Sequence, residues 1–467
     1  MVRELLEKAR GGLSMFTAYN TNVDAIVYLN GETVQRLIDE FGAEAVKRRM
    51  EEYPREINEP PLDFVARLVH ALKTGKPMAV PPLVNEELQA WFDSHFKYDV
   101  ERMGGQAGII ANLLANLDFR EVLVYTPPHL AKRQAEMFVK KPNLFYPVVE
   151  GGKLVLKHPW EAYRENDPVK VNRIFEFRAG TTFRLGNETI TVPPFSGRFI
   201  VSARFESIRI YTEPELKPFL PPEIGQRVDG AILSGYQGIK LRYSDGKDAN
   251  YYLREAKKDI LLLKREKDVK VHLEFASIQN RELRKKVIYN LFPLVDSVGM
   301  DEAEIAYVLS ALGYDKLAER IFTYNRIEDT VLGGKILIDE MNLELLQIHT
   351  IYYIMYIAHA NNPLSEAELR QSLELATTLA ASRASLGDIA SPDQISVGMN
   401  VPYNERGEYV KLRFEEAKRR LRTKEYKLVI IPTRLVQNPV STVGLGDTIS
   451  TGAFTSYLAM LKEKGEL

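Results

Sequence analysis

The stretch Ser441-Thr442-Val443-Gly444-Leu445-Gly446-Asp447-Thr448-Ile449-Ser450-Thr451-Gly452 organises the rest of the chain. It follows an apolar, strand-like run from Lys427 to Ile431 and opens a helical pattern from Ala453 to Lys462. A glycine-rich turn that leads into a helix collects unpaired backbone N–H groups at the positive end of the helix dipole. The stretch therefore predicts a phosphate-binding turn between a strand and a helix.

Two common phosphate motifs do not describe this turn. It is not a P-loop, because no glycine-lysine pair of the chain is followed by Ser or Thr. It is not a dinucleotide fingerprint, because Ile449 stands where a third glycine is needed. The turn instead carries Asp447, a carboxylate that would repel a resting phosphate. We interpret Asp447 as a base that takes a proton from an attacking hydroxyl; the alternative is an Asp helix N-cap behind a glycine turn.

Composition narrows the class of protein. A chain of 467 residues is long enough for more than one domain, or for one large α/β body with an added lobe. The 62 Lys and Arg residues balance 63 Asp and Glu residues, so no net field attracts nucleic acid or an anionic membrane. The absence of cysteine excludes disulfides and thiolate metal sites, and fits an intracellular, heat-adapted protein.

The chain also lacks the patterns of targeting segments. Residues Met1 to Gly12 mix charged and apolar side chains, unlike a signal peptide. The longest apolar tract, Ile348 to Ala360, is too short to span a bilayer. We expect a cytoplasmic protein without nucleic-acid or membrane partners, and a homo-oligomer stays open.

Strand and helix patterns alternate along most of the chain. Strand-like runs occur at residues 15–19, 121–125, 230–233, 269–275, 295–299, 345–349 and 428–431. Helical patterns occur at residues 31–52, 61–73, 109–117 and 130–139, and we expect a helix between each pair of the later strands. This alternation predicts an α/β fold with a doubly wound, mostly parallel sheet.

The stretch from Arg173 to Phe205 departs from this alternation. Its apolar residues alternate with polar ones, with turn signals at Asn187 and at Ser196-Gly197, which indicates antiparallel strands. We predict a smaller α+β lid domain, made of residues 25–102 and 170–204, over a cleft. The large domain then comprises residues 1–24, 103–169 and 205–467.

Polar residues follow the first strand at a spacing of two. In an extended run, Asn20, Asn22 and Asp24 all face one side. Short amides and a carboxylate on one side suit the hydroxyls of a sugar, and an Asx-turn cluster is the alternative.

Carboxylates also occur near the ends of two later strands. The strand alternation puts His272 and Glu274 on one side, and Asp301 and Glu304 begin a helix after another strand. Carboxylates at strand ends that face a phosphate site hold Mg²⁺, often through waters. A helix cap with an acid in the first turn is the alternative for Asp301 and Glu304.

Aromatic and cationic residues complete the candidates. The segment from His349 to Tyr353 ends a strand and is suited either to packing on an adenine or to the core. A cationic series in the strand-rich lobe could grip a phosphorylated substrate, and a solvated strand face is its alternative: Lys170, Arg173, Arg178, Arg198 and Arg204.

Five motifs occur in order over nearly the whole chain: Asn22-Val23-Asp24-Ala25-Ile26, Gly104-Gly105-Gln106-Ala107-Gly108, His272-Leu273-Glu274-Phe275, Ser297-Val298-Gly299-Met300-Asp301-Glu302-Ala303-Glu304, and Ser441 to Ser450. Together they resemble the ADP-dependent sugar kinases, a branch of the ribokinase-like superfamily found largely in heat-loving archaea. Within that family the chain is most similar to the ADP-dependent 6-phosphofructokinases.

The resemblance implies a role for each matching residue. Asp447 would be the catalytic base, with Gly444, Leu445 and Gly446 forming an anion hole. Glu274 and Glu304 would organise Mg²⁺, or another divalent cation, through water. Asp301 belongs to the same motif but departs from the Asn usual in the wider superfamily. The nucleotide would meet the residues Val443, Gly444, His349, Tyr353 and Arg209.

Sugar recognition is implied in the same way. The sugar would be held by Asn22, Asp24, Gly105 and Gln106. Glucokinases of the family have a glutamate where this chain has Ala79, and that carboxylate would repel the phosphate of fructose 6-phosphate. Lys170 and Arg204 match positions assigned to the sugar phosphate, and Arg178 is a further cationic candidate.

These observations predict a magnesium-dependent kinase that moves the β-phosphoryl group of ADP to the 1-hydroxyl of fructose 6-phosphate. The products would be fructose 1,6-bisphosphate and AMP, in a step of sugar breakdown. The alternatives are a glucokinase or bifunctional enzyme of the same family, and, more remotely, a non-catalytic sensor of sugar phosphates or nucleotides.

Overall fold

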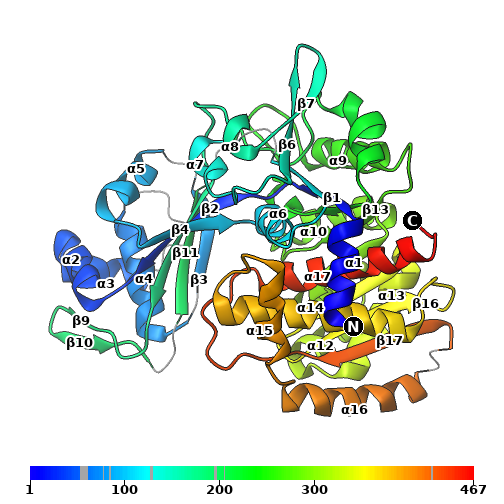
Figure 1. Ribbon diagram of the computed structural model, residues 1–467. Coiled ribbons are helices and arrows are strands. Elements are labelled where there is room, and N and C mark those ends of the chain that lie inside the picture. The colour runs from blue at the N-terminus through cyan, green and yellow to red at the C-terminus, as the bar shows by residue number, and fades with distance from the viewer. Residues whose placement is uncertain are drawn as a thin grey trace.

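The computed structural model describes residues 1–52, 61–76, 78–83, 86–126, 130–193, 197–203, 206–421 and 424–467. It contains a large sheet flanked by helices, and a smaller sheet beside it with its own helices (Figure 1). Among the described residues, no helix is long and apolar enough to cross a membrane.

The large sheet has ten strands in the order β17-β16-β15-β14-β13-β12-β1-β5-β6-β7. Their bounds are β1 Ser14–Ala18, β5 Glu121–Tyr125, β6 Leu144–Glu150, β7 Lys153–Lys157, β12 Gly230–Leu233, β13 Lys270–Glu274, β14 Ser297–Asp301, β15 Leu345–His349, β16 Tyr353–His359 and β17 Tyr426–Pro432. Every neighbouring pair from β15 to β6 is parallel, whereas β16, β17 and β7 join antiparallel. The predicted α/β fold with a mostly parallel sheet is confirmed.

Two sets of helices cover this sheet. One set comprises α1 Val2–Gly12, α6 Gln106–Asn116, α14 Glu366–Leu386 and α17 Leu445–Glu463, which pack on one another (Figure 1). The second set comprises α9 Ala249–Leu263, α10 Arg281–Leu291, α11 Glu302–Leu312, α12 Asp315–Tyr324, α13 Ile327–Met341 and α16 Glu405–Arg420. The short helices α7 Lys132–Ala135, α8 Pro159–Ala162 and α15 Ile395–Met399 lie in the connections.

The two ends of the chain meet in the first set of helices. Helix α1 packs against α17, and Lys8 Nζ lies 3.0 Å from a carboxylate oxygen of Glu463. The first and last helices therefore cover the same face of the large sheet.

The smaller sheet has five strands in the order β3-β11-β8-β2-β4. Their bounds are β2 Asn22–Tyr28, β3 Met78–Leu83, β4 Val100–Gly104, β8 Val171–Phe177 and β11 Gly197–Ala203. Helices α2 Gly31–Phe41, α3 Ala43–Glu52, α4 Leu62–Thr74 and α5 Glu86–His95 accompany it, with the hairpin β9 Thr182–Leu185 and β10 Glu188–Thr191. Its separate core contains a cluster of phenylalanine rings, in which the ring centre of Phe64 lies 4.7 Å from that of Phe92 and 5.0 Å from that of Phe175.

The smaller sheet takes its strands from both predicted lid segments. Strand β2 already begins at Asn22 and β4 ends at Gly104, slightly outside the predicted limits of 25 and 102. Strands β8 and β11 lie within residues 170–204 and pair antiparallel, as the alternation there predicts. The division into two domains at these limits remains a prediction.

Several predicted elements differ from the structure. The helix predicted at residues 31–52 breaks at Gly42, whose φ of 82° ends α2 before α3 begins. The helix predicted at 130–139 contracts to the single turn α7. Strands β2, β3, β4, β6, β7 and β16 were not expected. The helices predicted between residues 349 and 428 are present, but an unexpected strand comes first, because a turn at Thr350 returns the chain as β16 before α14 begins.

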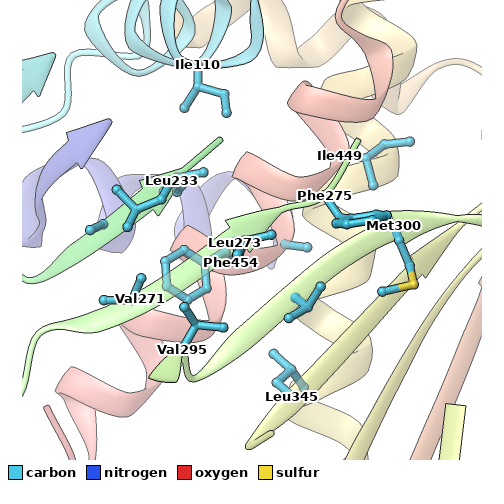
Figure 2. Packing of buried hydrophobic residues seen from close by; sticks show 14 of the residues in the cluster. Ile110, Leu233, Val271, Leu273, Phe275, Val295, Met300, Leu345, Ile449 and Phe454 are labelled. Carbon is cyan, nitrogen blue, oxygen red and sulfur yellow. The ribbon is translucent and has the colours of Figure 1, made fainter. Parts of the chain in front are cut away.

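Helix α17 is buried along most of its length. Figure 2 shows Phe454 of this helix over Val271, Leu273 and Val295 of the sheet region. On its other side Gly452 approaches α14 so closely that an added Cβ would lie 2.9 Å from the Cα of Ala376. Some hydroxyl groups of α17 bond within the helix, as Thr455 does to the carbonyl of Thr451, whereas that of Ser450 accepts a hydrogen bond from Gln347 of β15. The sheet on one side and α14 on the other therefore hold α17 in position.

We expect Gly444→Ala to destabilise the protein more than Gly465→Ala. Both glycines have a left-handed backbone, with φ of 73° and 74°, so alanine costs each about 1–2 kcal/mol. Only at Gly444 would the Cβ also collide, 2.8 Å from Ile109 Cγ2; nothing lies within 4 Å of a Cβ at Gly465. Overpacking adds about 1–3 kcal/mol. Calorimetric melting checks this, and equal midpoints for the two variants would contradict it.

Candidate active site

The glycine turn stands at the N-terminus of α17. Gly444 is the N-cap, Leu445 is the first helical residue, and Asp447 lies in the first turn. Asp447 is therefore not the N-cap, and the capping interpretation of this residue is wrong. None of the described residues donates a hydrogen bond to its carboxylate. The turn thus presents backbone N–H groups beside an acid that the helix does not need for capping.

The carboxyl group of Asp447 lies in an environment that favours its neutral form. The pKa of Asp447 is raised to about 7, mainly by desolvation and also by the nearby carboxylates of Glu274 and Asp24, against the opposing effect of Arg383. The side chain keeps some contact with solvent. A pKa near neutrality is what a general base needs at physiological pH.

The predicted sugar-binding residues of β2 lie together. Asn22 donates a hydrogen bond of 2.7 Å to Asp24, and Asn172 of β8 donates one of 3.1 Å to the same oxygen. The side chains of Asn22 and Asp24 both lie against Gly104. A Cβ added to this glycine would lie 2.2 Å from Asn22 Nδ2 and 2.2 Å from Asp24 Oδ1. Burial raises the pKa of Asp24, and Asp24 in turn influences Asp447. The cluster therefore lies near the candidate base.

Three further predicted sugar-binding residues border this cluster. Gly105 has a φ of 78°, and a Cβ there would lie 2.5 Å from the carbonyl oxygen of Asn20. Gln106 begins α6 and accepts a hydrogen bond of 3.3 Å from Gln237. Lys170 is buried, and its ammonium group donates to the side chain of Asn20. The structure thus brings β2, β4, α6 and Lys170 together.

The cationic series of the strand-rich lobe separates in the structure. Arg173 is 1% exposed and pairs with Asp93 at 2.8 Å, so it is neither a solvated residue nor a phosphate ligand. Arg178 and Arg198 line a cavity of about 500 Å³ between the smaller sheet and residues 439–443. Arg204 lies outside the described residues, as does the side chain of Ala79; only its place in β3 is defined.

Three predicted metal-site carboxylates lie at the ends of β13 and β14. Glu274 accepts a hydrogen bond from His272, at 3.1 Å, and burial lowers the pKa of that histidine to about 3. Asp301 and Glu304 form a capping box: Asp301 accepts from the N–H of Glu304, and Glu304 accepts from the N–H of Asp301. The capping alternative for Asp301 and Glu304 is therefore confirmed.

These carboxyl groups disfavour one another's ionisation. The pKa of Glu304 is raised to about 9, mainly by burial and also by the neighbouring Asp301 and Glu274. Burial likewise raises the pKa of Glu274 to about 7. A divalent cation would relieve this crowding. Among the described residues no three His, Cys, Asp or Glu side chains cluster closely enough to ligate a metal together.

Glu304→Gln should make melting less sensitive to pH. Because the folded-state pKa of about 9 exceeds the unfolded value of 4.5, the folded protein keeps a proton that the unfolded chain loses. Stability is therefore lost as pH rises from about 4.5 to 9. Melting of the metal-free protein from pH 5 to pH 9 tests this, and we expect a shallower decline in the variant. Superimposable profiles would contradict the assignment.

A second cavity of about 560 Å³ adjoins the turn and is largely apolar. Its walls include His349, Ile351, Leu435, Leu445 and Ile449. The Nδ1 atom of His349 is buried without a partner among the described residues, and a Cβ on Gly446 would lie 3.0 Å from its Nε2. An apolar cavity with a few polar groups suits a purine base.

Two predicted nucleotide contacts lie elsewhere. Tyr353 is buried in the core and is absent from the walls of this cavity. Arg209 stacks 4.1 Å from the ring centre of Tyr243 and donates to Tyr252 at 2.9 Å. Neither placement tests a contact that forms only with nucleotide, so both roles remain predictions.

The two cavities meet at Pro439 and Thr442, which line both. Arg102 of β4 lies in register with Asp24 and donates to the hydroxyl of Ser441 at 3.2 Å. The sugar cluster and the phosphate turn are therefore linked directly across the cleft. The sequence analysis assigned no role to Arg102, nor to Arg383 behind the turn. The sequence signal that could have identified Arg102 is its position two residues before Gly104, because residues two apart in a strand face the same side.

The glycine turn at the start of α17, with Asp447 in its first turn and an apolar cavity beside it, has the features of a small-molecule phosphotransferase site. Residues 13–456 match the model of the ADP-specific phosphofructokinase/glucokinase conserved region. The chain belongs to this family of ADP-dependent kinases, as the motifs predict.

Individual relatives agree with this assignment. The chain is 99% identical, over 467 residues and the full length of both chains, to an ADP-specific phosphofructokinase of Thermococcus kodakarensis. A crystal structure of a phosphofructokinase from Pyrococcus horikoshii with AMP is 66% identical, with a TM-score of 0.89 over 97% of this chain and 99% of that one. An ADP-dependent kinase in complex with fructose 6-phosphate and ADPβS is 39% identical, with a TM-score of 0.84 over 99% and 97%.

Proposed function

We propose that the chain transfers the β-phosphoryl group of ADP to the 1-hydroxyl of fructose 6-phosphate, giving fructose 1,6-bisphosphate and AMP. The observation that carries this proposal is the position of Asp447. It stands in the first turn of α17, beside the glycine turn and within the electrostatic reach of Asp24. A base between an anion site and a sugar cluster can deprotonate a hydroxyl as it attacks phosphorus.

The reaction balances with these groups alone. The oxygen of the 1-hydroxyl forms a bond to the β-phosphorus, and its proton passes to a carboxylate oxygen of Asp447. The bond between the β-phosphorus and the bridging oxygen breaks, and AMP leaves with that oxygen. The backbone N–H groups of Gly444, Leu445 and Gly446 stabilise the charge on the moving phosphoryl group. Asp24 and Asn22 orient the sugar by accepting from and donating to its hydroxyls.

The carboxylates of Glu274 and Glu304 fit a hydrated Mg²⁺. Such an ion, when bound, would screen the negative charge of the nucleotide phosphates. His272 holds Glu274 in place, and the capping box holds Glu304. Glu274 and Glu304 are therefore held at defined positions beside the proposed ion. Other divalent cations could replace Mg²⁺.

The specificity for ADP and for fructose 6-phosphate is supported by different observations. The matching family model describes ADP-specific kinases. Gly446 lines the apolar cavity, so an adenine base bound in that cavity would lie close to the phosphate turn. A relative binds fructose 6-phosphate together with an ADP analogue. The buried cation Lys170 next to the sugar cluster supports a phosphorylated sugar over glucose.

One assay tests the function. Purified protein is given ADP or ATP, each with fructose 6-phosphate or glucose, and AMP or ADP formation is followed with Mg²⁺ present. We expect AMP to form with ADP and fructose 6-phosphate, and little turnover with the other pairs. Efficient turnover of glucose would favour the bifunctional alternative, and activity confined to ATP would overturn the proposal.

A further inference from the structure

Hydrogen bonds join helix α14 to the loop of residues 434–443, which leads to the phosphate turn. Thr377 accepts a hydrogen bond of 2.8 Å from the N–H of Arg434, where the loop begins. The carbonyl of Ala384 accepts one of 2.8 Å from the N–H of Val440. Arg383 Nε donates one of 3.1 Å to the carbonyl of Val443. The last contact reaches the peptide that enters the turn.

Arg383 is held tightly in this position. It is 6% exposed, and its Nη1 lies 3.0 Å from a carboxylate oxygen of Asp388. A Cβ on Gly444 would lie 3.2 Å from its Nε and 3.3 Å from its Cζ. The guanidinium group therefore lies against the turn itself, where a glycine leaves room for it.

The hydrogen bond to Val443 has a geometric consequence for Gly444. In a planar, trans peptide the carbonyl and the N–H point in opposite directions. Because the carbonyl of Val443 faces Arg383, the N–H of Gly444 faces the other side of the turn. Arg383 also brings a positive charge to a site crowded by the carboxylates of Asp24, Glu274 and Asp447.

We propose that Arg383 is a positioning residue for phosphoryl transfer. It fixes the peptide between Val443 and Gly444 so that the N–H of Gly444 faces the transferred phosphoryl group, and it places a positive charge behind the turn. This inference rests on the proposed kinase function, since it concerns the same phosphate turn.

The test compares two arginines of the same helix. Arg370 also donates to a backbone carbonyl, that of Ile430, at 3.0 Å, but away from the turn. We expect Arg383→Gln to lower kcat about 10-fold or more, because the loss of one donor to a transition state costs about 10²–10³-fold and Arg383 acts through such a donor. The KM for fructose 6-phosphate should stay within about twofold, and Arg370→Gln should retain wild-type kcat.

Calorimetric binding of ADP and AMP separates positioning from folding. AMP lacks the phosphate that meets the turn, so Arg383→Gln should weaken ADP binding and leave AMP binding unchanged, and Arg383→Lys should restore part of the ADP affinity. Equal losses for ADP and AMP, or equal losses of kcat in both glutamine variants, would overturn the inference. Failure of the wild-type protein to turn over ADP and fructose 6-phosphate would instead overturn the proposed function. The ratio of ADP to AMP affinity does not depend on turnover, so it tests the role of Arg383 separately.

Should Arg383→Gln fail to fold, Asp388→Asn provides the second variant. It removes the ion pair of Arg383 but keeps the hydrogen bond to Val443. We expect it to lower the melting temperature while kcat stays within about twofold of wild type. A 10-fold loss of kcat here, with unchanged ADP affinity, would overturn the inference.

Discussion

Asp447→Asn should lower kcat by about 10²–10⁴-fold, the range expected when a general base is removed. The amide is isosteric and cannot accept the proton of the sugar hydroxyl. Since Gly444 and not Asp447 caps α17, the helix should survive the change. Steady-state kinetics with ADP and fructose 6-phosphate measure the effect, and KM should change little.

The pH dependence of the wild-type enzyme provides the matching evidence. With the pKa of Asp447 raised to about 7, the base is protonated below neutrality, so kcat/KM should climb as pH rises through 7 and level off above it. The residual activity of Asp447→Asn should lack this limb.

Stability should respond in the opposite direction. The folded-state pKa of Asp447 lies above the unfolded value of 3.8, so its contribution to stability is lost as pH rises through about 7. At pH 8 the Asn variant should melt no earlier than the wild type. Asp315→Asn, in the first turn of α12, is a control for the loss of charge at a helix N-terminus. Near-normal kcat in folded Asp447→Asn would remove Asp447 from the mechanism.

Lys170→Met should raise the KM for fructose 6-phosphate by roughly 10–100-fold. A charge-assisted contact to the sugar phosphate contributes about 1.5–3 kcal/mol, which corresponds to that factor. Methionine keeps most of the volume of this buried side chain, so the change tests charge and not a cavity. We expect kcat to fall by a much smaller factor than the factor by which the KM for fructose 6-phosphate rises.

Glucose is the control for this variant. It lacks the phosphate, so any weak glucose activity should be almost unaffected by Lys170→Met. Arg204→Ala, at a position outside the described residues, should act in the same direction as Lys170→Met. An equal loss for both sugars would mean that Lys170 supports the site and does not recognise the phosphate.

The sequence predicts the central sheet best. Strands β12 and β15 begin and end where the apolar runs do, because buried parallel strands are short, continuous runs bounded by turns. The same signal hides β16: Tyr353 to His359 continues an apolar tract, and the reversal is seen in the structure, where Tyr353 donates to Thr350 and β16 pairs antiparallel with β15.

At the site, local pattern predicts which residues are near one another but not always what each does. The spacing of two correctly places Asn22 beside Asp24. The alternation in the strand-rich lobe does not reveal that Arg173 points into a core to meet Asp93, since that partner comes from a distant helix. Arg383 carries no local signal either, because its role depends on how α14 packs against residues 434–443.

The contact between α1 and α17 has a consequence for protein engineering. Lys8 Nζ already lies 3.0 Å from Glu463, so a short peptide can join the two ends while new ends are opened at the β9–β10 turn. In the resulting circular permutant the segment with Asp447 precedes the segment with Asp24, and the large sheet has to assemble the same strand order from a different chain order.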